Sequence, residues 1–142
     1  MRKYYVFHLR RSSYEAYDGK ESSLFLSLQK LRETKGYAEG LSLYNQICDP
    51  FDVSQLQEYF SKKYHVEKKK RYYFVDHKYD QTYLLELNYS CLVLLTKENL
   101  PNVFLNLSFY SPYLFVCDFE NKDYFWLYDI TSRTRKYAYN QV

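Results

Sequence analysis

The sequence has only three glycines, three prolines and three cysteines among its 142 residues. Three scattered glycines cannot form a phosphate-binding loop or a dinucleotide-binding turn, because both need several glycines close together. So few glycines and prolines also argue against a scaffold made mainly of loops. The cysteines, Cys48, Cys91 and Cys117, lie far apart in the chain and lack the spacing of a metal site. We therefore expect buried, reduced thiols in a cytoplasmic protein.

Patterns typical of enzymes and of membrane proteins are also missing. The three histidines, His8, His65 and His77, are scattered, and none lies at i, i+4 spacing from a second metal ligand. The longest fully apolar run, from Cys91 to Leu95, is far too short to cross a bilayer. We therefore expect no enzymatic activity, no cofactor or metal ion, no small-molecule substrate and no membrane insertion.

Aromatic residues are what the sequence has in excess: they make up 21% of the chain, with 19 tyrosines and 10 phenylalanines. Their side chains carry a large apolar area, and tyrosine adds a polar tip, which suits both a packed core and a protein–protein interface. Charge is nearly balanced, with 20 basic and 17 acidic residues and a net charge of +3. That charge is too small to indicate a nucleic-acid partner by itself.

The N-terminal segment predicts a strand followed by two helix starts. Residues 4–9 are rich in strand formers and are apolar on both alternating faces, so we expect a central strand. Ser12 and Glu15 form a capping-box pattern for a short helical turn. Asp18 and Glu21 form a second such pattern, which predicts a longer helix after Gly19.

The rest of the chain predicts helices first and mainly strands afterwards. Apolar residues recur at helical spacing as far as Lys63, with a further cap pattern at Asp52 and Gln55, and short apolar runs with tight junctions follow. We therefore expect one α+β domain over residues 1–130, with a mostly antiparallel sheet of about five to six strands and about four helices packed on it. Residues 131–142 are polar and basic and predict a loose tail. The remaining expected elements are a helix ending near Gly36, helices over 37–48, 53–63 and 99–110, and strands over 71–75, 82–87, 91–95, 114–119 and 124–128.

The elbow over residues 14–22 joins the first strand to the long helix and is the main candidate for a binding surface. Tyr14 and Tyr17 are three residues apart, so both lie on the same side of a short helical turn. Two exposed rings would make good interface anchors, because few rotatable bonds are frozen on binding. Alternatively, both rings fold onto the first strand and Phe25. The spacing leaves both arrangements open.

A basic run beside aromatic strands suggests a second functional hypothesis. Residues 68–71 are basic and precede the aromatic stretch 72–74, and residues 4–7 offer a second aromatic strand. Proteins that bind single-stranded nucleic acid combine these two features, and each stacked base contributes about 1–3 kcal/mol. The alternative is a solvated turn of lysines that leads into a core strand. The second hypothesis is therefore a single-stranded nucleic-acid-binding protein.

Four stretches follow one another in a recognisable order. They are Tyr4-Tyr5 with residues 17–25, Asn45-Gln46-Ile47 before Pro50, residues 100–107 leading to Pro112-Tyr113-Leu114, and Asp118-Phe119 with residues 124–127. In this order they resemble the SirA family, the sporulation inhibitors of replication in endospore-forming bacteria. The chain departs from the family pattern at Asp18, Phe125 and Asp129, where the family usually has an aromatic residue, a glycine and a proline.

The resemblance implies a non-enzymatic inhibitor that binds the N-terminal domain of the replication initiator DnaA and blocks its action at the chromosome origin. In the family, the binding surface is formed by the segment before the aromatic-Gly-basic-Glu-Ser motif and by a glutamine farther on. These positions fall on Ser13, Tyr17 and Gln46. Ser13 lacks the bulky ring of the family, and we expect the neighbouring Tyr14 to compensate. With the flanking residues, the expected partner-binding set is Ser13, Tyr14, Tyr17, Asp18, Lys20 and Gln46.

Overall fold

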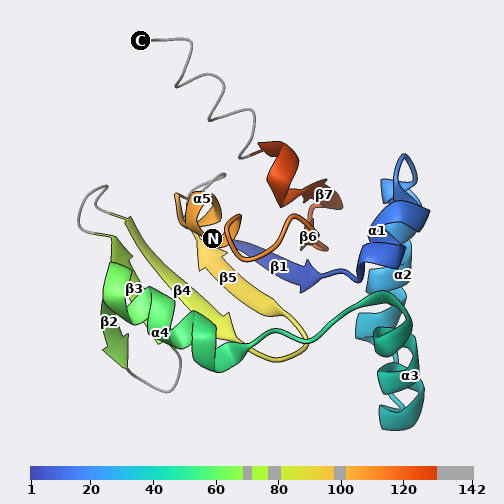
Figure 1. Ribbon diagram of the computed structural model, residues 1–142, viewed down its shortest axis with the longest axis horizontal. Coiled ribbons are helices and arrows are strands. Elements are labelled where there is room, and N and C mark those ends of the chain that lie inside the picture. The colour runs from blue at the N-terminus through green and yellow to red at the C-terminus, as the bar shows by residue number, and fades with distance from the viewer. Residues whose placement is uncertain (69–71, 77–80, 98–101, 131–142) are drawn as a thin grey trace, which may run out of the picture.

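β1 (Arg2–His8), the first strand of the chain, lies in the interior of an antiparallel sheet. The computed structural model describes residues 1–68, 72–76, 81–97 and 102–130, and these form seven strands in the order β2-β3-β4-β5-β1-β6-β7 (Figure 1). β1 pairs with β5 on one side and with β6 on the other, so Tyr5 lies between Val93 and Cys117. The prediction of a central first strand is confirmed. The other strands are β2 (His65–Lys68), β3 (Tyr72–Asp76), β4 (Gln81–Leu87), β5 (Leu92–Thr96), β6 (Leu114–Asp118) and β7 (Asp123–Trp126).

Helices pack on both faces of the sheet, because β1 directs apolar side chains to both. In Figure 1, α1, α2 and α3 lie together beyond the C-terminal end of β1, whereas α4 crosses in front of β2, β3 and β4. A single α+β domain is therefore confirmed. In the described part of the chain, no helix has the length and apolar character needed to cross a membrane. The helices are α1 (Arg11–Tyr17), α2 (Glu21–Glu33), α3 (Tyr37–Ile47), α4 (Val53–Lys63) and α5 (Val103–Leu107).

One face of the sheet packs against α4 and α5. Tyr4 and Val6 of β1 are fully buried there, and the Tyr4 ring meets Phe104 of α5 edge to face with centroids 5.4 Å apart. Phe60 anchors α4 in the same core. Burying one such side chain contributes about 1.5–3 kcal/mol. The expected cap of α4 is confirmed, because the Asp52 carboxylate accepts a hydrogen bond from the Gln55 amide at 3.1 Å.

The opposite face packs against α2 and forms a second core. Phe7 and Leu9, which alternate with Val6 and His8 along the chain, are buried there against Leu24, Phe25 and Leu28 of α2. Phe115, Cys117 and Trp126 of β6 and β7 complete this cluster. The two-residue period of β1 thus predicts which residues belong to which core. β1 and β6 contribute alternate residues to both cores, and α1 and the end of α3 pack on the second one through Tyr14, Tyr17 and Ile47.

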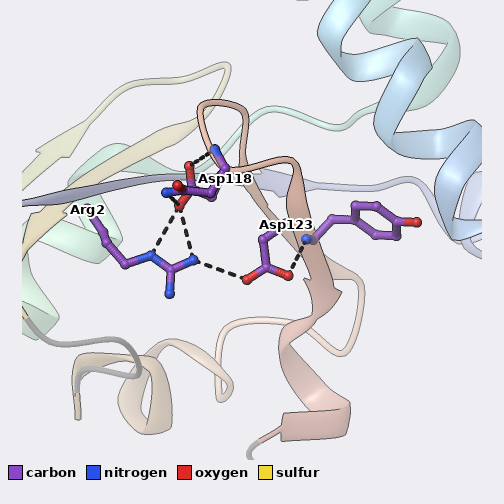
Figure 2. A network of polar contacts seen from close by, with 5 residues as sticks. Arg2, Asp118 and Asp123 are labelled. Atoms are coloured by element: carbon purple, nitrogen blue, oxygen red, sulfur yellow. Dashed lines mark hydrogen bonds and ion pairs between the residues drawn. The ribbon is translucent and has the colours of Figure 1, made fainter.

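Arg2 ties the start of β1 to the hairpin of β6 and β7 (Figure 2). Its guanidinium lies 3.0 Å from the Asp118 carboxylate and 3.1 Å from that of Asp123. Asp118 is buried and also accepts two hydrogen bonds from Asn121. Burial raises the pKa of Asp118, but the bonds from Asn121 and Arg2 outweigh it, so the pKa lies below the usual value. The carboxylate therefore stays ionised and holds the hairpin turn.

Several boundaries differ from the sequence-based expectation. Both expected N-terminal capping boxes are wrong: α1 begins after Arg10 and α2 after Lys20, and neither cap residue makes a side-chain cap bond. Ser12 lies inside α1, and Asp18 is its C-terminal cap. Residues 127 and 128, expected in the last strand, begin a helical turn instead.

Other expectations fall partly outside the described residues. α5 covers only the middle of the helix expected over 99–110, and Pro101 is not among the described residues. The basic tail over 131–142 also lies outside them. β2 was not expected, because its residues run directly into the lysine-rich segment and show no distinct apolar alternation.

Candidate partner-binding surface

α1 is held by its neighbours rather than by its own caps. Among its residues, Arg11 and Glu15 form an i, i+4 ion pair at 3.1 Å, but both are exposed, so the pair contributes little. Gly19 has a φ of +75°, which lets the chain turn sharply from α1 into α2. The Glu21 carboxylate accepts a hydrogen bond from the Gly19 amide at 3.2 Å and another from the Trp126 indole at 3.3 Å. These bonds fix the elbow against β7.

The structure brings Ser13 of α1 next to Gln46 of α3. The Ser13 hydroxyl is buried and donates to the Gln46 carbonyl at 3.4 Å. The Arg10 amide donates to the Ile47 carbonyl at 3.0 Å, and the Arg10 guanidinium donates to the Asn45 carbonyl at 2.8 Å. Three consecutive carbonyls at the end of α3 are therefore bound by the start of α1. The two segments expected to bind the partner form one continuous surface.

Tyr14 and Tyr17 are partly exposed and partly packed on the core, so each of the two arrangements that the sequence left open holds in part. Both rings are half-buried and pack against the second core. Tyr14 lies between Tyr113 and Trp126, with both centroid separations at 4.9 Å. Burial is the main reason that the pKa of Tyr14 is raised. The Tyr17 hydroxyl lies 3.4 Å from that of Ser27 on α2. Each ring is therefore partly packed on the core and partly exposed to solvent.

The remaining expected residues are exposed. Asp18 and Lys20 flank the elbow, and Gln46 is exposed at the end of α3. We call the set Ser13, Tyr14, Tyr17, Asp18, Lys20 and Gln46 the α1–α3 surface. Within it, Ser13 lies beneath the surface and joins the helices, whereas the other five side chains reach solvent at least in part.

Sequence reasoning missed the residues that support this surface. Arg10 binds the end of α3 and also lies 3.6 Å from the Asp49 carboxylate. Tyr113 and Trp126 contact the ring of Tyr14 and hold it in place. Nothing local marks these three residues, because each contacts a segment that is distant in the sequence: Arg10 the end of α3, and Tyr113 and Trp126 the ring of Tyr14.

The described residues contain neither a cluster of metal ligands nor a reactive thiol. No group of three or more His, Cys, Asp or Glu residues in the described ranges could hold a metal ion. The cysteines are free thiols, and burial raises the pKa of Cys48 to about 12 and of Cys91 to about 11. Burial also raises the pKa of Cys117. None of the three is therefore an activated nucleophile near neutral pH.

The structure argues against one of the two aromatic strands on which the nucleic-acid hypothesis depends, namely β1. Tyr4 and Phe7 are buried in opposite cores, and Tyr5 lies under the Arg32 guanidinium, 4.8 Å from its ring centroid. These rings are not available to stack on bases. Residues 69–71 of the basic run lie outside the described part of the chain.

A comparison with models of protein families shows to which family the chain belongs. The family model described as "Sporulation inhibitor of replication protein SirA" matches residues 2–131. The chain belongs to the SirA family. SirA proteins are non-enzymatic inhibitors of replication that act on the initiator DnaA. The comparison with curated proteins finds no match for this chain.

The match to SirA covers both helical layers and the whole described sheet. One departure from the family pattern has a structural explanation. The ring of Phe125 is half-buried and packs edge to face on Tyr4 at 6.3 Å and on Phe104 at 6.0 Å. The ring therefore packs against the core on the face opposite α2, whereas Tyr14 and Tyr17 pack against the other core. For Asp129, the structure offers no explanation.

Proposed function

We propose that this SirA-family chain inhibits replication by binding the N-terminal domain of DnaA through the α1–α3 surface. The observation that carries the proposal is the hydrogen bond from Ser13 to the Gln46 carbonyl. It brings together the two segments that the resemblance implies as parts of the binding surface. Binding covers the initiator domain and prevents the contacts it needs at the chromosome origin. The proposal also implies a cytoplasmic location, because the initiator acts on the chromosome.

The half-buried rings support this role. Tyr14 and Tyr17 are each fixed on one side by core contacts, so little conformational entropy is lost when a partner covers the other side. Exposed polar groups at Asp18, Lys20 and Gln46 surround them. Aromatic anchors with a polar rim are typical of the energetic centre of an interface.

Interferometry with the purified N-terminal domain of DnaA tests the proposal. We expect wild type to bind, and Gln46→Ala to bind with an affinity lower by about 1–2 kcal/mol, because an exposed amide loses its partner contact. Gln55→Ala is the matched control, since Gln55 is an exposed amide on α4, on the opposite face of the sheet. No binding of folded wild type at tens of micromolar, or equal losses in both variants, would contradict the proposal.

A further inference from the structure

A groove of about 720 Å³ lies between α3, the C-terminal end of α2 and the turn that joins β4 to β5. Its lining is largely apolar and includes Tyr5, Leu31, Tyr37, Leu41, Tyr44 and Tyr89. We call it the α3 groove. The sequence predicts Tyr37, Leu41 and Tyr44 as one side of a helix, and the structure turns this side into the groove rather than into a core.

The rim of the α3 groove exposes large apolar side chains. Tyr37 is 84% exposed, Leu41 44% and Tyr89 71%. In α3 itself, Ile47 is the buried residue, so most of the helix projects from the body of the protein. Large apolar side chains gathered at one place on a surface typically mark an interaction site.

The groove is also fixed in shape. The Tyr44 hydroxyl lies 3.1 Å from the Asp49 carbonyl and 3.2 Å from the Tyr89 carbonyl, so it links α3 to two other segments. The Phe51 amide donates to the same Tyr89 carbonyl at 2.8 Å. These bonds hold the turn at Tyr89 opposite α3, so a ligand would meet a preformed groove and not have to order it.

The charged residues that line the groove are basic, and the Glu39 carboxylate lies at its edge beside Gly36. Arg32 and Lys35 line it, and none of the described lining residues is acidic. Neither cation forms an ion pair with a carboxylate in the described ranges of the chain. The Arg32 guanidinium rests on aromatic rings instead, 4.8 Å from the Tyr5 centroid and 5.3 Å from that of Phe119. A ligand with apolar anchors and negative charge would complement this lining.

We propose that the α3 groove binds an acidic segment of the DnaA N-terminal domain that carries leucine or aromatic anchors. This inference rests on the proposed function and extends its interface. The two surfaces meet at the C-terminal end of α3, because Asn45 lines the groove and the next residue, Gln46, belongs to the α1–α3 surface. A stable interface engages about 20–30 residues on each partner, many more than the α1–α3 surface offers.

The shape of the groove favours a protein segment over a small molecule. The groove is open, and its most exposed side chains, Tyr37 and Tyr89, stand on its rim. A small ligand on the floor would leave these rings in water. A helical or extended segment lying along α3 would cover them, as when an amphipathic segment binds in an apolar groove.

The apolar part of the proposal is tested with the full chain and the purified N-terminal domain of DnaA by interferometry. Replacing both Tyr37 and Leu41 with Ser removes the exposed apolar wall at little risk to folding, which circular dichroism checks. We expect affinity to fall about tenfold, mainly through faster dissociation. Phe109→Ser is the matched control, because this 69% exposed ring lies in the turn after α5, and α5 packs on the opposite face of the sheet. Equal affinity of the groove variant and wild type would overturn the inference.

The electrostatic part is tested with Lys35→Glu. We expect Lys35→Glu to bind the DnaA domain about tenfold more weakly than wild type at low salt. We also expect its affinity to depend less on salt concentration than that of wild type. A photo-crosslinking residue at Tyr37 identifies the contact: the expected product joins this position to a carboxylate-rich DnaA peptide. Crosslinking to a basic DnaA peptide, to a second copy of this chain or to no DnaA peptide would overturn the inference.

The outcomes separate the two proposals. If wild type binds, Gln46→Ala weakens binding and the groove variants do not, the α1–α3 surface stands and the α3 groove is excluded. If wild type does not bind the DnaA domain, both proposals fail. A small anionic compound that binds the groove without competing with the DnaA domain would also overturn the inference.

Discussion

Trp126 of β7 donates a hydrogen bond from its indole nitrogen to the Glu21 carboxylate of α2 at 3.3 Å, across 105 positions of sequence. The same carboxylate oxygen accepts from the Gly19 amide, and the same indole ring supports Tyr14. One acid at the start of α2 therefore links the elbow, the last strand and the ring of a proposed anchor. This link fixes the position of Tyr14 within the α1–α3 surface.

We expect Glu21→Ala to lower the free energy of unfolding by about 1–2 kcal/mol, because two hydrogen bonds are lost at the start of α2. Glu21→Gln is the control, since its side chain keeps an acceptor oxygen and should lose only a few tenths of a kcal/mol. Urea unfolding measures both values. Trp126 is the only tryptophan, so its fluorescence also reports the change at this site. Equal stability of Glu21→Ala and wild type would show that the bond contributes nothing.

At Tyr17, we expect replacement by Ala to reduce the affinity for the DnaA N-terminal domain by about 1–3 kcal/mol. Tyr17→Phe keeps the ring and loses only the hydroxyl that lies near Ser27, so its affinity should stay close to that of wild type. Because the ring is half-buried, affinities are compared per folded molecule after thermal melting of each variant. Reduced stability with unchanged affinity would identify Tyr17 as a core residue without a binding role.

Two carboxylates that bind the same arginine should differ sharply in their contribution to stability. Asp118 is 1% exposed and Asp123 52% exposed, and both contact Arg2. We expect Asp118→Ala to cost about 2–3 kcal/mol, since it removes the buried partner of Arg2 and two bonds from Asn121. Asp123→Ala should cost less than about 1 kcal/mol, because an exposed pair is screened by water. Chemical denaturation measures both, and similar costs would contradict the argument.

His8 should make stability depend on pH. Its ring lies between Phe51 and Tyr110, and burial lowers its pKa despite the opposing effects of Asp49 and the Pro50 carbonyl. Because the unfolded chain binds this proton near pH 6.5 and the folded chain only at lower pH, the contribution to stability is present above about pH 6.5. It is lost as the pH falls from there towards the folded pKa.

Urea unfolding of wild type and His8→Gln between pH 8 and pH 5 checks this prediction. The other histidines and the acidic residues titrate in both proteins, so the difference between the two pH profiles isolates His8. We expect wild type to lose more stability than His8→Gln as the pH falls. Parallel profiles would mean that His8 titrates normally in the folded protein.

The sequence alone determined the elements that depend on short-range periodicity. The two-residue alternation of β1 predicts which residues belong to which core, because successive side chains of a strand point to opposite faces. Helical spacing and the Asp52 cap predict α4 correctly, because these signals lie within a few residues of each other. The order of the resembling stretches also leads to the SirA family, which matches residues 2–131.

Only the tertiary structure decided how the surfaces are assembled. The contact of Ser13 with Gln46 and the support of Tyr14 by Trp126 join segments that are distant in sequence, and no local pattern encodes such distances. The cap patterns at Ser12 and Asp18 gave wrong starts, because Arg10 and Glu21 bind more distant partners that fix the elbow instead. Likewise, helical spacing puts Tyr37, Leu41 and Tyr44 on one side of α3, but only the tertiary structure makes this side the wall of a groove, because α3 lies beyond the end of β1 and leaves Tyr37 and Leu41 in solvent.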